Sequence, residues 1–125
     1  ITNRFLTASD ISVSVSHTVS AFNIYYLDEF LNWCKETGLP RPWLGRVHDP
    51  ILMQPTVWNA QARSAIVHNL SNSKHFDCRV WAKMIESTDS SNQFNAFKDR
   101  VRQNDEYRGT SFKKTFPEMV VFLDK

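Results

Sequence analysis

The first third of the chain alternates apolar and polar residues and then changes to a helical period. Residues 11–20, ISVSVSHTVS, place aliphatic side chains at alternate positions with mainly serine or threonine between them. This period of two predicts a strand with one apolar and one hydroxyl face. Residues 23–37 then carry apolar side chains at helical spacing, namely Ile24, Leu27, Leu31 and Cys34. Residues 42–47 predict a second short strand.

The remainder of the chain has the period of helices. Apolar residues recur every third or fourth position in residues 57–70, in residues 74–87 and again from Phe94 toward Gly109. The helix over 74–87 is expected to bury Phe76, Val80, Trp81, Met84 and Ile85. In the chain as a whole, the positions expected among the most buried are Val13, Val15, Leu27, Phe30, Leu31, Trp81 and Phe97.

These segments predict an α/β chain. A strand–helix–strand unit in residues 1–58 precedes a mainly helical extension in residues 59–125, and the two pack as one compact unit. Parallel strands need neighbours on both sides, yet only two strands are predicted. Because the chain also begins at Ile1 and not at an initiator methionine, we expect it to be the C-terminal part of a longer α/β protein, or a small domain related to one.

The amino-acid composition limits which kinds of molecule we expect this protein to bind. Hydrophobic residues make up 42% of the 125 positions and aromatic residues 13%, which is enough for a core and argues against disorder. Basic and acidic residues number 15 and 13 and are interspersed, a balance that permits nucleic-acid binding without requiring it. No apolar run approaches the roughly 20 residues of a membrane-spanning helix. We therefore expect no membrane partner.

The two cysteines predict buried thiols and no metal site. Cys34 and Cys78 lie 44 positions apart, each within a predicted helix, and neither belongs to a Cys-x2-Cys pair. Free cysteines are among the most often buried residues, so a disulfide is not expected. Free thiols are typical of a reducing compartment, which predicts a cytoplasmic protein.

Polar side chains gather where the first predicted strand meets its helix. In parallel α/β proteins, ligands bind at the carboxyl ends of the strands. The hydroxyl and amide groups there would bind a small polar ligand, or would serve only to cap the helix, which Asn23 alone can do. The candidate cofactor-binding residues are Ser14, Ser16, Thr18, Ser20 and Asn23.

Arg46 and His48 follow the second predicted strand and are candidate substrate-binding residues. Arg46 has the geometry to bind a carboxylate or phosphate bidentately; the alternative is a solvated arginine or an ion pair with Asp49. For His48, and for His17 near the end of the first strand, the alternative is a hydrogen-bonded structural histidine. The sequence contains no glycine-rich phosphate loop and no nucleophile elbow, so no catalytic residue is assigned.

The last third of the chain is rich in basic residues. Acidic residues interleave with them, which is typical of a solvated helix face; a surface for a protein or nucleic acid is the alternative. The basic residues are Lys98, Arg100, Arg102, Arg108, Lys113 and Lys114, and the acidic residues are Asp99, Asp105 and Glu106.

Two segments carry a resemblance to a known family. The run ISVSVSHTVSAFNIYYLDEFLNWC, followed by LPRPWLGRVHDP, resembles the late barrel strands of radical S-adenosylmethionine proteins, in particular the twitch-domain-containing subgroup encoded by tailed phages of marine bacteria. The end of the chain resembles that subgroup's closing Asp-x-x-Arg-x-x-Ser-Phe-x-x-x-Phe-Pro-Glu pattern. The matching residues are Asp105, Arg108, Ser111, Phe112, Phe116, Pro117 and Glu118.

The resemblance implies the C-terminal part of a partial (β/α)6 barrel. The whole enzyme would use a 4Fe-4S cluster to cleave S-adenosylmethionine to a 5′-deoxyadenosyl radical, and it would act in the cytoplasm, of the host cell if phage-encoded. In that enzyme the candidate cofactor-binding residues named above would line the S-adenosylmethionine side of the cavity, and Arg46 and His48 the substrate side.

One departure from the family limits what this chain does alone. The family's Cys-x3-Cys-x2-Cys loop is absent from the sequence, and two distant cysteines cannot hold a cluster. The chain would therefore not be catalytic by itself, would carry no cofactor alone, and would have the missing N-terminal part of the same protein as its partner. A small-molecule or peptide substrate is compatible with this interpretation, and nucleic acid is not expected. The alternative is a small non-enzymatic helical module that binds a protein or nucleic acid through residues 98–114.

Overall fold

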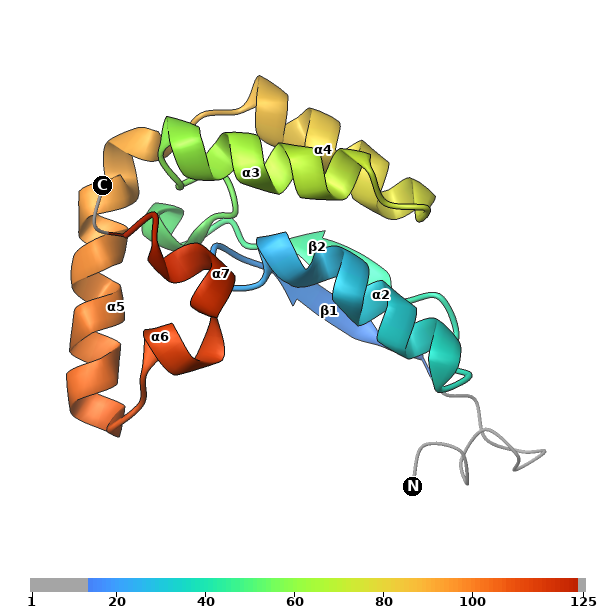
Figure 1. The fold of residues 1–125 in the computed structure, drawn as a ribbon, viewed down its shortest axis with the longest axis horizontal. Helices are drawn as coiled ribbons and strands as arrows, with labels where there is room; N and C mark the ends of the chain where they lie inside the picture. Colours follow the sequence, from blue (N-terminus) through green and yellow to red (C-terminus); the bar gives the residue numbers. More distant parts are fainter. Residues whose placement is uncertain (1–13, 124–125) are drawn as a thin grey trace.

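The computed structural model describes residues 14–123, and 60% of these residues are helical (Figure 1). None of the helices in this range has the length and apolar character that crossing a membrane requires. The elements, with η for 3-10 helices, are β1 (Ser16–Val19), η1 (Ile24–Tyr26), α2 (Leu27–Glu36), β2 (Trp43–Arg46), η2 (Ile51–Met53), α3 (Ala60–Ser71), α4 (Phe76–Ser87), η3 (Ser91–Gln93), α5 (Phe94–Arg108), α6 (Phe112–Thr115) and α7 (Pro117–Val120).

β1 and β2 form a two-stranded parallel sheet, and the crossover between them contains α2. Ser16 lies opposite Trp43 and Val19 lies opposite Arg46. Val19 is buried under the helices, whereas Ser16 and the neighbouring Thr18 are exposed. The sheet therefore has one apolar face and one hydroxyl face, in agreement with the period of two in the sequence.

The prediction of a partial (β/α)6 barrel is wrong. Residues 14–123 contain only two strands, each of four residues, and every later element is a helix. The sequence after residue 57 has a helical period throughout, so it offers no β-rich run that would extend the sheet. The described chain is thus a mostly helical protein that contains one strand–helix–strand unit.

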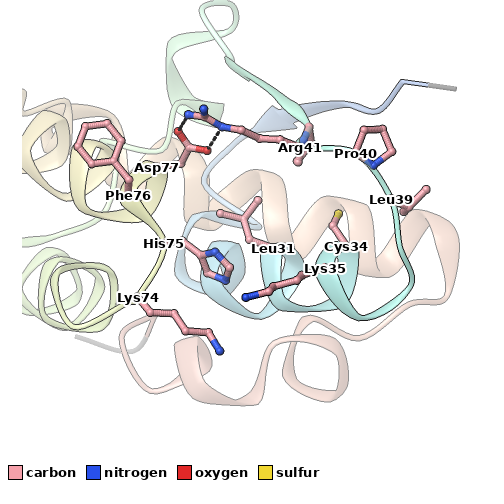
Figure 2. Close-up of a pocket in the computed structure, with 11 residues that line it drawn as sticks. Leu31, Cys34, Lys35, Leu39, Pro40, Arg41, Lys74, His75, Phe76 and Asp77 are labelled. Carbon is pink, nitrogen blue, oxygen red and sulfur yellow. Dashed lines mark hydrogen bonds and ion pairs between the residues drawn. The ribbon is translucent and has the colours of Figure 1, made fainter. Parts of the chain in front are cut away.

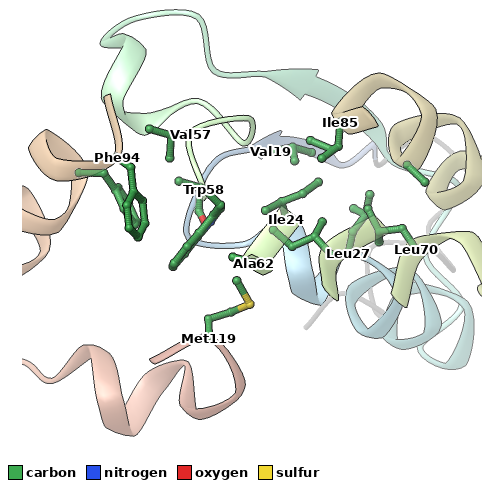
Figure 3. Packing of buried hydrophobic residues seen from close by; sticks show 14 of the residues in the cluster. Val19, Ile24, Leu27, Val57, Trp58, Ala62, Leu70, Ile85, Phe94 and Met119 are labelled. Atoms are coloured by element: carbon green, nitrogen blue, oxygen red, sulfur yellow. The ribbon is translucent and has the colours of Figure 1, made fainter. Parts of the chain in front are cut away.

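Trp58 lies at the centre of the hydrophobic core (Figure 3). Its side chain is fully buried, and its Nε1 donates a hydrogen bond of 2.8 Å to the carbonyl oxygen of Ala21. The rings of Phe94 and Phe97 lie 5.8 and 5.0 Å from it between centroids. Trp58 therefore connects the turn after β1 with α5, and Met119 of α7 joins the same buried cluster.

α3 and α4 lie side by side and pack through narrow stripes of buried residues (Figure 1). The stripes consist of Ala62, Ile66 and Leu70 on α3 and of Cys78, Ala82 and Ile85 on α4. Asn59 caps α3 by accepting a hydrogen bond from the backbone of Ala62 at 2.9 Å. Arg63 of α3 donates to the carbonyl oxygens of Ile85 and Thr88, which satisfies carbonyls at the end of α4.

The expected burial pattern is confirmed in part. Three of the positions expected to be most buried are so: Leu27, Leu31 and Phe97. Three others are only half-buried: Val15, Phe30 and Trp81. Val13 lies outside the described residues. Phe30 and Trp81 pack against the margin of the core, and Phe30 stacks on His17, so neighbouring elements cover these side chains only in part.

The prediction for α4 fails at Phe76 and Val80. These side chains are 66% and 46% exposed, whereas Ile85 is buried as expected. α4 has apolar residues on more than one side, and the stripe of Cys78, Ala82 and Ile85 is the one that meets α3. The flank that carries Phe76 and Val80 is consequently left toward solvent.

Replacing Trp58 with phenylalanine is expected to destabilise the fold by about 1–3 kcal/mol, because the buried carbonyl of Ala21 loses its donor. Urea unfolding followed by far-ultraviolet circular dichroism measures the change. Trp43→Phe is the matched control, since Trp43 is 77% exposed and its replacement should stay within about 0.5 kcal/mol. Equal effects of the two substitutions would show that the fold does not depend on the Trp58 hydrogen bond.

Candidate functional site at the carboxyl ends of the strands

The loop after β2 folds back onto the end of β1. The backbone N–H of Val47 donates to the carbonyl of Val19 at 3.1 Å, and that of Ala21 donates to Met53 at 2.9 Å. These bonds hold the segment 47–56 beside the turn that leads from β1 into η1. The carboxyl ends of both strands, where the sequence places the candidate site residues, therefore share one region of the molecule.

Asn23 closes the turn at the end of β1. Its Oδ1 accepts from the backbone N–H of Ser20 at 2.8 Å, and its Nδ2 donates to the carbonyl of Thr18 at 2.9 Å. The expectation that Asn23 caps the following helix is wrong, because its side chain makes no bond to the first turn of η1. The Ser20 hydroxyl accepts from the backbone N–H of Phe22 at 3.2 Å. Both side chains thus shape the turn.

The hydroxyl face of the sheet consists of Ser14, Ser16 and Thr18, with Gly45 and Trp43 beside them on β2. The three hydroxyl-bearing residues are exposed, and their hydroxyls form no hydrogen bond with other described side chains or backbone. The Trp43 side chain is 77% exposed. This face therefore presents free hydroxyl groups next to an aromatic ring, which suits a polar ligand.

Arg46 lies on the opposite, helix-facing side of the sheet. Its Nη2 donates to Gln54 Oε1 at 3.3 Å, and its Nη1 lies 3.8 Å from the sulfur of Met84. Its Nε is buried and has no hydrogen-bond partner within the described part of the chain. A buried unsatisfied donor costs about 1–3 kcal/mol.

The alternative of an ion pair between Arg46 and Asp49 does not occur, since none of the ion pairs formed among residues 14–123 includes Arg46. Arg46 therefore holds a half-buried positive charge with no carboxylate beside it. His48 is exposed, and its carbonyl oxygen accepts from Gln54 Nε2 at 2.8 Å. Gln54 thus links the two candidate substrate-binding residues.

The structure places the predicted cofactor and substrate residues on different faces. Thr18 pairs with Gly45 on the exposed face, whereas Arg46 pairs with the buried Val19. A single small ligand held by the hydroxyl groups would not reach the Arg46 guanidinium without passing the sheet. The two groups of residues consequently form two neighbouring surfaces.

His17 is a half-buried residue of β1 that stacks on Phe30, with ring centroids 4.0 Å apart. Its Nε2 is buried and has no hydrogen-bond partner among the described residues. Burial lowers the pKa of His17 below its ordinary value of 6.5, because the charged imidazolium is poorly solvated there. The aromatic stacking indicates a packing role.

A hollow of about 380 Å³ lies apart from the strand ends, between α2 and the beginning of α4 (Figure 2). Lys35 and Lys74 line this hollow. His75 Nε2 is hydrogen-bonded to Asn32 Oδ1 at a distance of 2.7 Å. The Arg41–Asp77 ion pair closes one side, so part of the positive charge is neutralised. His75 lies in the turn between α3 and α4, and no spacing in the sequence indicates that this turn meets α2.

The Cys34 thiol also lines this hollow, and burial raises its pKa, which keeps it protonated and unreactive. The second thiol, Cys78, is buried between α3 and α4, where burial raises its pKa to about 11. Within residues 14–123 no three histidine, cysteine or acidic side chains lie close enough to hold a metal ion. The two cysteines do not form a cluster-binding set.

The residues of the closing sequence pattern fold the end of the chain back onto the core. Asp105 accepts from the backbone of Phe112 at 3.1 Å, and Ser111 caps α6 through Lys114 at 3.3 Å. Glu118 accepts a hydrogen bond of 2.5 Å from the Tyr26 hydroxyl, which lowers the pKa of Glu118. The pattern therefore has a structural role here.

The basic residues near the end are interleaved with acids in space as well. Arg102 pairs with Glu106 at 3.1 Å on the exposed face of α5, four residues along the helix. Such exposed pairs are typical of a solvated helix face. The surface 98–114 thus offers mixed charge and not a continuous basic patch.

Asn23→Ala is expected to destabilise the protein by about 1–2 kcal/mol, since it removes two hydrogen bonds that close the turn. Thermal and urea unfolding measure the change. Thr18→Val is the neighbouring control, because it removes an exposed hydroxyl without a described partner and should alter stability by less than about 0.5 kcal/mol. A neutral Asn23→Ala would refute a structural role of the amide.

The lowered pKa of His17 predicts a pH dependence. The unfolded chain binds the proton more readily than the folded one, so the contribution of neutral His17 is fully present above about pH 6.5 and is lost as the pH falls through the lowered folded-state pKa. His17→Leu should flatten the fall in the free energy of unfolding between about pH 7.5 and 5, relative to the unmodified protein. Superimposable pH profiles of the two proteins would contradict this.

Comparisons with known proteins give no relative. No family model matches the chain, and neither a curated protein nor a solved structure shows significant similarity to it. The function has to be inferred from the sequence and from the geometry described above.

Proposed function

We propose that this chain is the C-terminal part of a cytoplasmic radical S-adenosylmethionine enzyme and is not catalytic by itself. Support comes from the sequence resemblance in residues 11–50 and 105–118 and from one structural observation. That observation is a parallel sheet whose hydroxyl face is left uncovered by every described element. Parallel sheets are normally covered on both faces, so this face is expected to meet a cavity in the whole protein.

The residues of the uncovered face have the chemistry that such a cofactor needs. S-adenosylmethionine presents ribose hydroxyls, an amino group and a carboxylate, all of which exchange hydrogen bonds with serine and threonine. We assign Ser14, Ser16 and Thr18 to direct contact with the cofactor. Ser20 and Asn23 would hold the end of the strand in position, because their polar atoms are engaged in the turn.

Arg46 and His48 are assigned to the substrate side, where the Arg46 guanidinium supplies a positive charge for a carboxylate or phosphate. The 4Fe-4S cluster does not fit the residues described here, because Cys34 and Cys78 are buried on different helices. Its ligands would belong to the N-terminal part of the same protein. The substrate would be a small molecule or a peptide.

The complete reading frame provides the test. Its product is expected to contain a Cys-x3-Cys-x2-Cys loop, to bind iron and sulfide after anaerobic reconstitution and, with a reductant, to convert S-adenosylmethionine to methionine and 5′-deoxyadenosine, detected by mass spectrometry. The 125-residue chain alone should remain colourless. A reading frame that starts at this chain and lacks the cysteine loop would refute the proposal.

In the complete protein, Ser16→Ala is expected to weaken S-adenosylmethionine binding by about 1 kcal/mol, the scale of one neutral hydrogen bond. The melting temperature should stay unchanged, because the Ser16 hydroxyl has no described partner. Ser64→Ala on the exposed side of α3 is the matched control. Isothermal titration calorimetry measures the affinity for S-adenosylmethionine. Equal affinities of the two variants would show that Ser16 does not contact the cofactor.

A further inference from the structure

The outer edge of β2 is open. The N–H groups of Trp43 and Val47 point to β1, where they donate to Val15 and Val19. Because N–H groups alternate in direction along a strand, those of Leu44 and Arg46 point the other way. No strand within residues 14–123 pairs with that side of β2. Leu44 and Arg46 therefore offer backbone donors and acceptors to an additional strand.

A hollow with both apolar and charged lining runs along this edge. Trp43, Leu44 and Trp81 line it together with Pro42 and the Arg41–Asp77 pair, and its volume is about 450 Å³. Phe76 and Val80 extend the apolar surface on the exposed flank of α4. A free strand edge beside a hollow that accepts side chains is the arrangement that binds an extended peptide by strand addition.

The positive charge of Arg46, at the end of β2, indicates which kind of segment would bind at this edge. Leu44 and Arg46 lie two positions apart on β2 and so share the helix-facing side of the sheet. The Arg46 guanidinium ends between Met84 and Gln54, and within residues 14–123 its buried Nε has no hydrogen-bond partner and its charge no ion pair. A carboxylate at the accessible part of the guanidinium would neutralise the half-buried charge.

We propose that the β2 edge binds an extended segment of a partner polypeptide that carries an apolar residue and an acidic residue two positions apart. The apolar side chain would enter the hollow beside Leu44 and Trp81, and the carboxylate would bind Arg46. Backbone hydrogen bonds to Leu44 and Arg46 would add the segment to the sheet as a third strand. The surface lies apart from the hydroxyl face and does not depend on the cofactor site proposed above. It includes Arg46, so a segment bound here would occupy the substrate position assigned above to that side chain.

A library of short random peptides displayed on phage, selected on the immobilised chain, tests the proposal. The selected peptides are expected to share an apolar–any–acidic pattern and to shift the backbone amide signals of Leu44 and Arg46 in heteronuclear NMR spectra. Arg46→Met should weaken their binding by about tenfold or more, the effect of losing a charge-assisted hydrogen bond. Arg100→Met on the exposed side of α5 is the matched control and should leave the affinity unchanged.

Two further measurements identify how the peptide binds. Arg46→Glu should reverse the selected pattern, so that lysine or arginine replaces the acidic residue. N-methylation of the peptide amides that face β2 should abolish binding, because strand addition needs them. A selection without a shared pattern, or amide shifts confined to other elements, would overturn the proposal. Concentration-dependent self-association that is lost in Trp81→Ala would also overturn it, since the surface would then bind a second copy of the chain.

Discussion

The burial of Trp58 is the interaction on which the rest of the structure depends. Its ring fills the space between the sheet, α3 and α5, and its Nε1 bonds the Ala21 carbonyl, which belongs to the turn leaving β1 (Figure 3). A two-stranded sheet is at best marginally stable alone. The strand–helix–strand unit is stabilised by its contacts with the helices that follow, of which Trp58 supplies the most deeply buried, and side-chain bonds such as Tyr26–Glu118 and Asn32–His75 add to it. The position of every candidate site residue on β1 and β2 is therefore set by contacts outside the sheet.

The same packing leaves the sheet one-sided. α2 and α4 contribute the side chains that lie under Val19 and Leu44, whereas the hydroxyl face and the outer edge of β2 remain uncovered among the described residues. Covering a parallel sheet on one side only exposes backbone donors, hydroxyls and aromatic rings that would otherwise be buried. Arg46 lies on the helix-facing side next to the open edge of β2 and has no ion-pair partner among the described residues. The hydroxyl face and the outer edge of β2 are thus the parts of the sheet that are open to a ligand.

Periodicity predicted the helices and the two faces of β1, because burial of one side of an element leaves a repeat in the sequence. It did not predict which flank of α4 is buried, since apolar residues occur on several sides of that helix and the contact with α3 selects Cys78, Ala82 and Ile85. Nor did it predict the bonds of Asn23, which are made backwards to Ser20 and Thr18. The sequence pattern shows which residues are able to form a bond or to be buried. Tertiary contacts decide which partner each side chain has.

The hydroxyl face and the Arg46 side chain lie on opposite sides of the sheet because the strands are pleated. Adjacent residues of a strand point to opposite sides, so Thr18 and Gly45 face outward while their neighbours Val19 and Arg46 face the helices. A ligand on the hydroxyl face and a strand on the β2 edge would therefore use different polar side chains, although Trp43 borders both surfaces. Because both surfaces use the backbone of the same two strands, an added strand would also stiffen the pair that carries the hydroxyl groups. Any coupling between the two surfaces would pass through the sheet itself.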